Sequence, residues 1–374
     1  MKFIISTQEL NFLINKVQAV VPAKATIPIL GNVLIEAKGG LLHFTATDLM
    51  VVIHCYTEAK IIEEGSTTLP AKKLAQLLKE LTAVNVEVSV NDRDVAQIVA
   101  GSSRFSLNGL SKKEYPTIPD LHGAEKFTMG QRELREMFYR TSFAVSKEDT
   151  RYVLTGVGVR INGGLATFTG TDGKRLARSE TPIDINKEFS SNYIIPLKAV
   201  DEFLRNLNDS GDVLVYLLSD KIALEANNTV VITKLLQGEY PDVARVIPEK
   251  SEHIISLHRE ELIHLLRQVS LFTSDASHSV KFTFVNGELK LSANSTDIGE
   301  GKVSMPVNYH NDPLDIAFNP GFFLDILRHS REETVTLGLT DPYNPGVIID
   351  KAVGKESPTS SPLFVIMPMR LNEE

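Results

Sequence analysis

A template of four apolar residues occurs six times along the chain and restricts the possible folds more than any other feature. In each copy the apolar residues stand at positions i, i+3, i+4 and i+7, which is the spacing of one buried helix face. The third and sixth copies match least well, because they end in Thr141 and Ser330. The pattern predicts six amphipathic helices. The copies begin at Leu10, Leu74, Leu134, Val200, Leu262 and Phe323, roughly 63 residues apart.

The six helices form three pairs within a longer repeat. The segments "FIISTQEL", "FTMGQREL" and "ISLHREEL" lie 124 and 128 residues apart, and each leads into the first helix of a pair. A proline opens the second helix of each pair, at Pro70, Pro196 and Pro320. Proline suits the first turn of a helix, where its missing N–H costs no hydrogen bond. An internal repeat of this length indicates three copies of one domain.

Stretches of alternating apolar and polar residues separate the helices and predict antiparallel strands joined by hairpin turns. Examples are "VLIEAKGGLLHFTATD", "GVGVRINGGLATFTGTD" and "VKFTFVNGELKLSAN". We therefore expect an α+β fold of three tandem domains, each with two helices backed by antiparallel sheet. Turn-forming and charged residues in "PDLHGAEK" and "PEKSEH" mark the boundaries, so that the predicted domains are residues 1–121, 126–249 and 252–374.

The dipeptide Thr-Asp follows a strand-like run at Asp48 and again at Asp172. A catalytic pair of carboxylates has to converge on one substrate, whereas equivalent residues of two repeats lie a domain apart. Thr-Asp after a strand is also a common turn former, so we interpret both residues as structural. One alternative is an enzyme that uses Asp172, Lys174 and Arg175 on a phosphorylated substrate. Another is a tandem-domain scaffold that binds only peptides.

Composition and motifs argue against most enzyme and metal-binding classes. Cys55 is the only cysteine, which excludes an internal disulfide and a cysteine-based metal cluster and indicates the cytoplasm. The histidines show no metal-ligand spacing. P-loop, nucleophile-elbow, HExxH and dinucleotide-binding motifs are missing from the sequence. We expect no catalytic residue, no cofactor, no metal and no membrane segment.

The outer faces of the predicted helices are basic, although the formal net charge of the chain is -8. Positions −2 and +5, counted from the first template residue, point away from the apolar face. The helix dipole favours cations near helix C-termini. This preference explains much of the basic character of position +5 but does not explain the basic residues at position −2. The pattern indicates a phosphate-facing surface, with a solvated helix face as the alternative. Position +5 holds Lys79, Arg205, Arg267 and Arg328, and position −2 holds Lys72, Arg132 and Lys198.

Four stretches spread over the chain carry a resemblance to one family. They are "IPILGN", "GTDGKRLA", "GEYPDVARVIP" and "FVIMPMRL". Together with the threefold repeat they resemble the bacterial sliding clamps, the beta subunits of DNA polymerase III. The resemblance implies DNA-clamp domains in a head-to-tail homodimeric ring, which encircles duplex DNA without reading its sequence and acts as a processivity factor of replication. Expected partners are the replicative polymerase, the clamp loader and other proteins with a clamp-binding motif.

The family's DNA-contacting positions match Lys24, Lys72, Lys198 and Arg205 in this sequence. An acid, Glu148, stands where a relative has a neutral polar residue, so we assign no DNA contact to it. Relatives often end at the position of the last leucine, whereas here "NEE" follows at residues 372–374. We expect this acidic tail to hang free.

The resemblance also implies an apolar pocket between the second and third domains that binds peptides of partner proteins. Methionines suit a shared site because their side chains adapt to varied apolar groups, and rim arginines are expected to meet polar or acidic partner groups. From the residues alone, "FVIMPM" also fits a core strand. The matching positions are Leu154, Thr171, Gly173, Arg175, Leu176, Pro241, Arg245, Val246, Val365, Met367, Pro368, Met369 and Arg370.

In the family, the subunit contact joins the first domain of one chain to the third domain of the other. The resemblance implies that Phe105 packs against Leu271 and Phe272, with Arg104 near the acids. Such a head-to-tail contact closes only because two copies complete the ring. The matching positions are Arg104, Phe105 and Leu107 on one side and Leu271, Phe272, Asp297 and Glu300 on the other.

Overall fold

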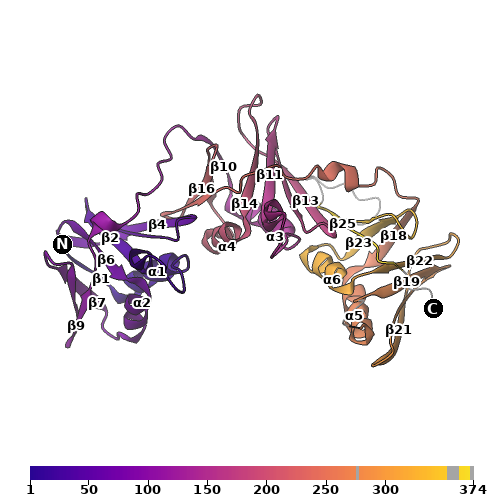
Figure 1. Ribbon diagram of the computed structural model, residues 1–374, viewed down its shortest axis with the longest axis horizontal. Helices are drawn as coiled ribbons and strands as arrows, with labels where there is room; N and C mark the ends of the chain where they lie inside the picture. The colour runs from indigo at the N-terminus through magenta and orange to yellow at the C-terminus, as the bar shows by residue number, and fades with distance from the viewer. Residues whose placement is uncertain (275–277, 352–361, 371–374) are drawn as a thin grey trace. The chain divides into compact units, whose positions relative to one another are not determined.

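The computed structural model describes residues 1–274, 278–351 and 362–370, so the acidic tail lies outside the described residues. Within these ranges the chain forms six α-helices, one at each apolar template, which confirms that prediction (Figure 1). None of them is long and apolar enough to cross a membrane. The helices are α1 (Thr7–Gln18), α2 (Ala71–Glu80), α3 (Gln131–Ser142), α4 (Leu197–Asn206), α5 (Arg259–Val269) and α6 (Pro320–His329).

Local sequence explains where the helices begin. The Ser6 side chain caps α1 by accepting a hydrogen bond from the backbone N–H of Glu9 at 3.1 Å. A side-chain oxygen at this position satisfies a backbone donor that has no partner within the helix. Pro320 is the first residue of α6, as predicted, whereas Pro70 and Pro196 are the last residues of the strands that precede α2 and α4.

Contacts divide the chain into two compact units. Unit 1 comprises Met1–Arg135 and Lys198–Leu235, and unit 2 comprises Glu136–Leu197 and Leu236–Glu374. The strand pairs of all four sheets are antiparallel. This arrangement of helices and antiparallel sheets confirms the predicted α+β class.

Unit 1 contains a five-stranded and an eight-stranded sheet, and its helices α1 and α2 pack against each other (Figure 1). The order in the smaller sheet is β5 (Lys60–Glu63), β1 (Lys2–Ser6), β7 (Asn85–Val90), β8 (Val95–Ala100) and β9 (Ser103–Asn108). The order in the larger sheet is β10 (Glu125–Gly130), β15 (Asp212–Leu217), β16 (Lys221–Ala226), β17 (Thr229–Lys234), β4 (Val51–Glu58), β3 (Leu41–Thr47), β2 (Asn32–Lys38) and β6 (Gly65–Pro70).

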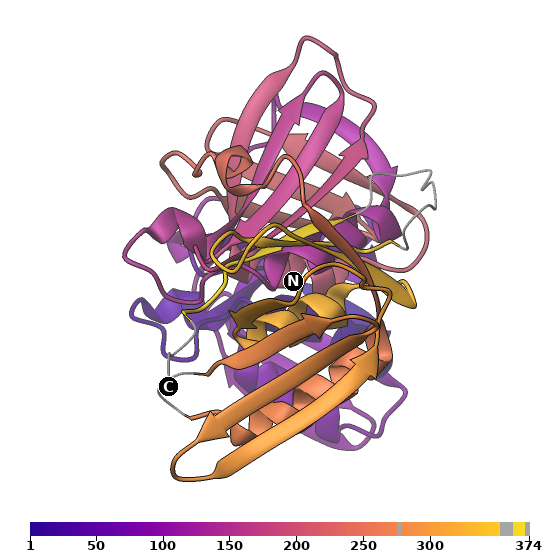
Figure 2. The same ribbon diagram turned by 90° about the vertical axis from the view of Figure 1, so that its right-hand side faces the viewer.

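Unit 2 contains an eight-stranded and a four-stranded sheet. In the larger sheet the order is β14 (Ser190–Pro196), β11 (Gly156–Asn162), β12 (Leu165–Thr171), β13 (Arg175–Pro182), β25 (Leu363–Ile366), β24 (Gly346–Ile349), β23 (Thr334–Leu339) and β18 (His253–His258). In the smaller sheet it is β21 (Gly299–Pro306), β20 (Glu288–Ser295), β19 (Val280–Val285) and β22 (Leu314–Phe318). α5 lies against β20 and β21 (Figure 2), and α5 and α6 also pack together.

The helix faces predicted to be apolar form the cores beneath the sheets. In α1 the four template residues, Leu10, Leu13, Ile14 and Val17, are buried. The two polar template residues are buried as well. The Thr141 hydroxyl donates to the Met137 carbonyl at 2.7 Å, and the Ser330 hydroxyl donates to the Ile326 carbonyl at 3.0 Å. These bonds to the preceding turn satisfy the hydroxyls inside the core, so the two weakest copies of the template still form buried faces.

Each eight-stranded sheet joins strands from two of the predicted domains. In unit 1, β17 pairs with β4, and Val231 lies opposite Ile53. In unit 2, β13 pairs with β25, and Leu176 lies opposite Val365. Backbone hydrogen bonds therefore cross both predicted boundaries, which the sequence pattern did not indicate. The division at residues 1–121, 126–249 and 252–374 stays a prediction from the sequence repeat.

The turns after β3 and β12 are built alike and explain the repeated Thr-Asp dipeptide. Asp48 Oδ1 accepts hydrogen bonds from the backbone N–H groups two and three residues later, at 3.0 and 2.7 Å. Asp172 Oδ1 does the same at 2.9 and 3.0 Å. The next residue has a positive φ in both turns, +76° at Leu49 and +84° at Gly173. Glycine adopts this left-handed conformation freely, whereas leucine is strained in it.

Two substitutions at Leu49 separate this strain from side-chain packing. L49A and L49G both remove the isobutyl group, but only glycine relieves the positive φ. We expect L49G to be more stable than L49A by about 1 kcal/mol, the reverse of the usual order. At the equivalent Gly173, an added Cβ meets only the flexible end of Arg151, and G173A should cost about 1 kcal/mol. Urea unfolding measures both differences, and an L49A variant that is the more stable would contradict the interpretation.

Candidate nucleic-acid interface and peptide pocket

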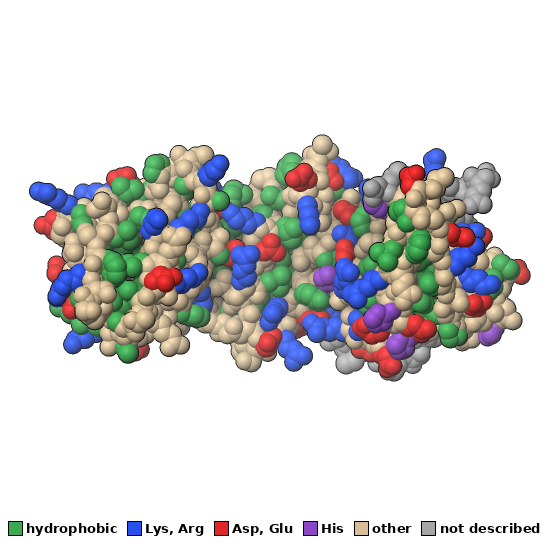
Figure 3. Space-filling model, turned by 90° about the horizontal axis from the view of Figure 1, so that it is seen from below, with side chains coloured by type: hydrophobic (Ala, Val, Ile, Leu, Met, Phe, Trp, Pro, Cys, Tyr) green, Lys and Arg blue, Asp and Glu red, His purple; other side chains and the backbone are tan. Residues whose placement is uncertain are grey.

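The basic residues of the helix template point outward, as predicted. All seven residues at template positions −2 and +5 are exposed. On the face drawn in Figure 3, blue Lys and Arg side chains lie among red Asp and Glu side chains. The helices therefore present cations to solvent, and Lys198, Arg205 and Arg328 each pair with an acid. The seven residues are Lys72, Arg132 and Lys198 at position −2 and Lys79, Arg205, Arg267 and Arg328 at position +5.

Two of the predicted DNA-binding residues lie close together in unit 1. Lys72, near the start of α2, donates from Nζ to the Ala23 carbonyl at 2.9 Å, and Lys24 is the neighbouring residue. Both lysines are exposed. A carbonyl oxygen carries no net charge, so this hydrogen bond leaves the positive charge of Lys72 uncompensated.

The other two predicted DNA-binding residues stand on α4, and each pairs with an acid. Lys198 Nζ contacts Asp48 Oδ2, and Arg205 contacts Glu202 Oε1 at 2.5 Å. The cationic side chains are 53% and 60% exposed, whereas the acidic ones are 11% and 3% exposed. Lys198 and Arg205 are seven residues apart, about two helical turns, and so share one face of α4. This face presents cations to solvent, with carboxylates behind them.

The two acids differ in how their surroundings shift their pKa. Burial raises the pKa of Glu202 above its ordinary value, although Arg205 acts in the opposite direction. Burial alone would also raise the pKa of Asp48, but hydrogen bonds from Lys198 and from the backbone of Val51 and Met50 outweigh it, so the pKa lies below its ordinary value. Asp48 is therefore ionised at neutral pH. The stability it contributes is present above its unfolded pKa and is lost as the pH falls through its folded pKa.

The predicted pocket residues of β12, β13 and β25 lie together in unit 2. Leu176 lies opposite Thr171 on one side and opposite Val365 on the other. The backbone N–H of Met367 donates to the Lys174 carbonyl at 2.9 Å. The C-terminal stretch therefore runs beside the turn that contains Gly173. Met369 turns toward another sheet, because its N–H donates to the Ala317 carbonyl of β22 at 2.8 Å.

Three further predicted pocket residues, Leu154, Arg245 and Val246, come from two short 3-10 helices of unit 2, η3 (Tyr152–Thr155) and η4 (Val243–Val246). Pro241 precedes η4, and Pro368 and Arg370 follow β25. Leu154 of η3 is buried. The segment that leads into η4 is held to the large sheet by Tyr240, whose hydroxyl donates to the Thr169 carbonyl of β12 at 3.2 Å. Val246 is 46% exposed and Met367 is 41% exposed. Both apolar side chains are thus available for contact.

Arg175 is occupied within the chain, contrary to the expectation for a rim arginine. Its Nε donates to Asp172 at 3.1 Å, its Nη1 to Asp325 at 2.6 Å and its Nη2 to the Phe143 carbonyl at 3.1 Å. The side chain is only 10% exposed. A substrate phosphate or a partner acid would have to displace these bonds. The rim position fits the exposed Arg245 and Arg370 better.

Sequence reasoning missed the residues of α6 that surround Arg175. The guanidinium lies 4.6 Å from the centroid of the Phe322 ring, and Asp325 stands one helical turn further along. Their spacing of three places them on one side of α6, but no local pattern indicates that this side meets β13. The contact depends on the pairing of β13 with β25.

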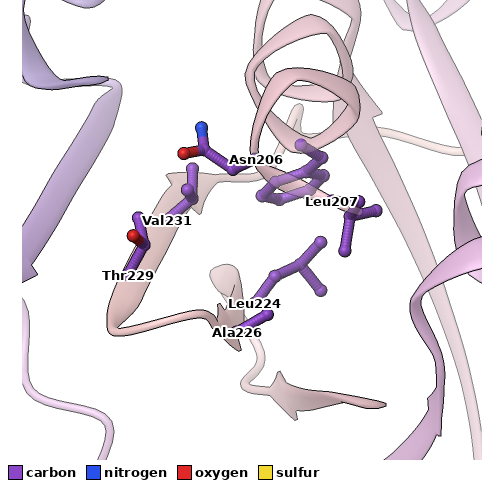
Figure 4. A pocket seen from close by; sticks show the side chains of 7 residues that line it. Asn206, Leu207, Leu224, Ala226, Thr229 and Val231 are labelled. Atoms are coloured by element: carbon purple, nitrogen blue, oxygen red, sulfur yellow. The ribbon is translucent and has the colours of Figure 1, made fainter. Parts of the chain in front are cut away.

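A small cavity lies in unit 1 between the end of α4 and the β16–β17 hairpin (Figure 4). Its volume is about 10 Å³, which is room for about one water molecule. Such a space is too small for a cofactor. The lining residues are Phe203, Asn206, Leu207, Leu224, Ala226, Thr229 and Val231. Among residues 1–274, 278–351 and 362–370, no group of three or more His, Cys, Asp or Glu side chains is arranged to hold a metal ion.

Repeated helix pairs with basic outer faces, backed by sheets that continue from repeat to repeat, are the construction of a DNA clamp. Domains of the DNA polymerase III beta subunit match residues 1–119 (N-terminal), 128–242 (central) and 244–370 (C-terminal). The beta sliding clamp of Chlamydia pneumoniae is 52% identical over 374 residues, covering 100% of both chains. That of Pseudomonas aeruginosa is 30% identical and covers 99% of this chain and 100% of its own.

Solved structures agree with the sequence comparison. The sliding clamp of Bacillus subtilis superimposes with a TM-score of 0.94 at 27% identity, covering 99% of each chain. A Pseudomonas aeruginosa clamp bound to griselimycin gives a TM-score of 0.93 at 30% identity, covering 99% of this chain and 100% of that one. The chain belongs to the DNA polymerase III beta subunit family, the beta sliding clamps. It is a processivity subunit without catalytic chemistry, and the enzyme alternative is wrong.

The different roles of the pocket arginines predict different effects on stability. Arg175→Ala removes the cation shared by Asp172, which is 15% exposed, and Asp325, which is 35% exposed and keeps Arg328; the loss should destabilise unit 2 by about 1–3 kcal/mol. Arg245→Ala removes a side chain that is 85% exposed and should cost less than about 0.5 kcal/mol. Urea unfolding of the two variants measures the contrast. Equal losses would contradict a structural role for Arg175.

Proposed function

We propose that two copies of this chain close a ring around duplex DNA and slide along it while holding the polymerase. The observation that carries the proposal is the pair of sheet edges left at β9 and β21. In the repeat, β9 corresponds to β17, because β9 pairs with β8 in the same register as β17 pairs with β16. In the same way, β21 corresponds to β4, because β21 pairs with β20 as β4 pairs with β3. β17 and β4 pair with each other within the chain. By the same rule, β9 of one copy pairs with β21 of the next.

The repeat also supports one register for the proposed contact. Val231 corresponds to Phe105 and Ile53 corresponds to Gly301, and Val231 lies opposite Ile53. Phe105 then lies opposite Gly301 of the partner subunit. A Cβ on Gly301 would stand 2.5 Å from Phe272 Cδ2, so the Phe272 ring covers this glycine. Phe105 therefore reaches the Phe272 ring across the interface.

The neighbouring side chains suit such an interface. Leu271 is 72% exposed in the single chain, and it gains an apolar partner when the interface forms. Arg104 on β9 and the acids Asp297 and Glu300 are exposed, so opposite charges meet at its rim. The contact is head-to-tail and leaves neither β9 nor β21 unpaired once two copies have joined.

DNA binding is supported by the exposed cations of the helices. Lys24, Lys72, Lys198 and Arg205 are the proposed contacts to phosphate. Such contacts are independent of base sequence and weaken with salt, which suits a ring that slides. The overall charge of -8 keeps DNA from coating the remaining surface. The proposed place of action is the cytoplasm, and the proposal requires no cofactor.

Partner binding is assigned to the surface that includes Met367, Val246 and the neighbouring exposed arginines. Apolar groups that adapt in shape, next to cations, suit a peptide with apolar and acidic side chains. The proposed partners are the replicative polymerase, the clamp loader and other proteins with a clamp-binding motif. A role as a peptide-binding scaffold without DNA has no observation in its favour. The three domain matches support the proposed division of the chain into three clamp domains.

Removing the apolar centre of the interface should open the ring. Phe105→Ala combined with Leu271→Ala deletes one apolar group from each side of it, and central apolar residues of this kind contribute about 2–4 kcal/mol each. We expect light scattering to show the mass of a single chain for the double variant and of two chains for the parent. Ile62→Ala is the matched control, because Ile62 is 52% exposed on the opposite edge of the same sheet. A double variant of unchanged mass would refute the interface.

Topological retention tests the ring itself. The labelled protein is loaded onto nicked circular DNA with its loader and ATP and isolated in moderate salt, and half of the sample is then linearised. An encircling ring slides off the linear DNA and stays on the circle. Equal retention on both would mean adhesive binding and would exclude the ring. If the protein does not load at all, a known clamp is loaded in parallel to check that the loader is active.

Charge reversal tests the DNA contacts in the same assay. Lys198→Glu with Arg205→Glu places two acids on the proposed DNA-facing side of α4, so we expect the loaded amount to fall by at least about tenfold, since each lost phosphate contact weakens binding. Lys60→Glu with Lys112→Glu changes the net charge equally at exposed positions outside the six α-helices and should load like the parent. If both double variants load equally poorly, the effect is due to net charge and not to contacts made by α4.

A further inference from the structure

The two DNA-facing cations of α4 have carboxylate partners within the chain, whereas Lys72 has a neutral one. Lys198 pairs with Asp48, and Arg205 pairs with Glu202. The second arrangement recurs in α6, where Arg328 lies 3.3 Å from Asp325 three residues earlier. The corresponding residues before Lys79 in α2 and Arg267 in α5 are Gln76 and His264. An acid partner is thus a property of particular helices and not of the template.

Asp48 is held in place independently of Lys198. Its Oδ1 accepts the two backbone hydrogen bonds of the turn, which leaves Oδ2 free to face α4. In the equivalent turn, Asp172 Oδ2 is occupied by Arg175, three residues further on. The first repeat has Val51 at that position, and a valine side chain offers no donor. The outer oxygen of Asp48 is therefore directed to a cation of the neighbouring helix.

Glu202 is similarly placed behind Arg205. It belongs to α4 itself, and its side chain is 3% exposed while that of Arg205 is 60% exposed. The guanidinium is accessible to a phosphate from solvent, but the carboxylate cannot move away with it. Lys198 is in the same situation, at 53% exposure in front of an aspartate that is 11% exposed.

We propose that Asp48 and Glu202 compete with DNA phosphates for Lys198 and Arg205 and thereby weaken these contacts enough for the ring to slide. The inference rests on the proposed function of a ring around DNA. A phosphate contact gains affinity when the cation releases a condensed counterion to solvent. A cation that already has a fixed internal anion neutralises the phosphate less completely and releases less. The contact remains long enough to centre the DNA and breaks readily at each step.

The test measures the affinity of the intact dimer for a labelled linear duplex as a function of salt concentration. Asp48→Asn keeps an oxygen for the backbone hydrogen bonds but removes the charge, and Glu202→Gln removes the charge behind Arg205. We expect each variant to bind roughly threefold more tightly at low salt, with a plot of log affinity against log salt steeper by up to about 0.9 per contact restored. Lys198→Gln should bind more weakly than the parent, and adding Asp48→Asn to it should have no further effect.

Asp172→Asn is the matched control. It removes the same charge at the equivalent turn, where the partner Arg175 is only 10% exposed, so we expect parental affinity and slope. Equal tightening by Asp48→Asn and Asp172→Asn would reduce the effect to net charge and overturn the inference. If the Asp48→Asn variant does not fold or does not form the dimer, the affinity of the Glu202→Gln variant is used for the test.

The remaining outcomes separate the inference from the proposed function. If Lys198→Gln weakens binding while Asp48→Asn and Glu202→Gln bind like the parent, the ring and its DNA contact stand and the inference fails. If Lys198→Gln also binds like the parent, Lys198 is not a DNA contact. In that case the inference fails together with this part of the proposed function.

Discussion

Hydrogen bonding between strands of successive repeats is the interaction on which the rest of the structure depends. A sheet edge presents unpaired backbone groups, and these must find partners or be protected. The pairing of β17 with β4 and of β25 with β13 satisfies the edges at two junctions between repeats. The same pairing brings functional side chains together. It places α4 next to the turn after β3, where Lys198 meets Asp48.

The proposed peptide pocket depends on the same kind of pairing in unit 2. Because β25 adds to β13, the C-terminal stretch runs beside the Gly173 turn and exposes Met367. Arg175 then links that turn to α6 through Asp325. A buried cation shared by two acids is costly to remove and stabilises one arrangement of the surrounding elements. In the proposed function, partner recognition is left to exposed groups, while the interior arginine holds the surface in shape.

Much of the architecture was predictable from local patterns. Helical periodicity predicted the six helices, their buried faces and the outward direction of residues such as Lys72 and Arg205. The repeated Thr-Asp dipeptide was correctly interpreted as a turn. The continuation of sheets across repeats was not predicted, nor was the acid behind Lys198, which lies 150 residues away in the sequence. Strand alternation indicates which face of a strand is buried but does not identify the neighbouring strand.

The sequence by itself determined that this chain repeats one helix-pair unit three times, and its motifs identified the family, because periodicity and motif residues are local properties. Only the tertiary structure decided which charges are compensated. It showed that Lys198 has a fixed anion beside it and that Arg175 is engaged by two acids and a backbone carbonyl of its own chain. The physical reason is that an ion pair requires close approach of two groups, and the distance between residues far apart in sequence is set by the pairing of strands.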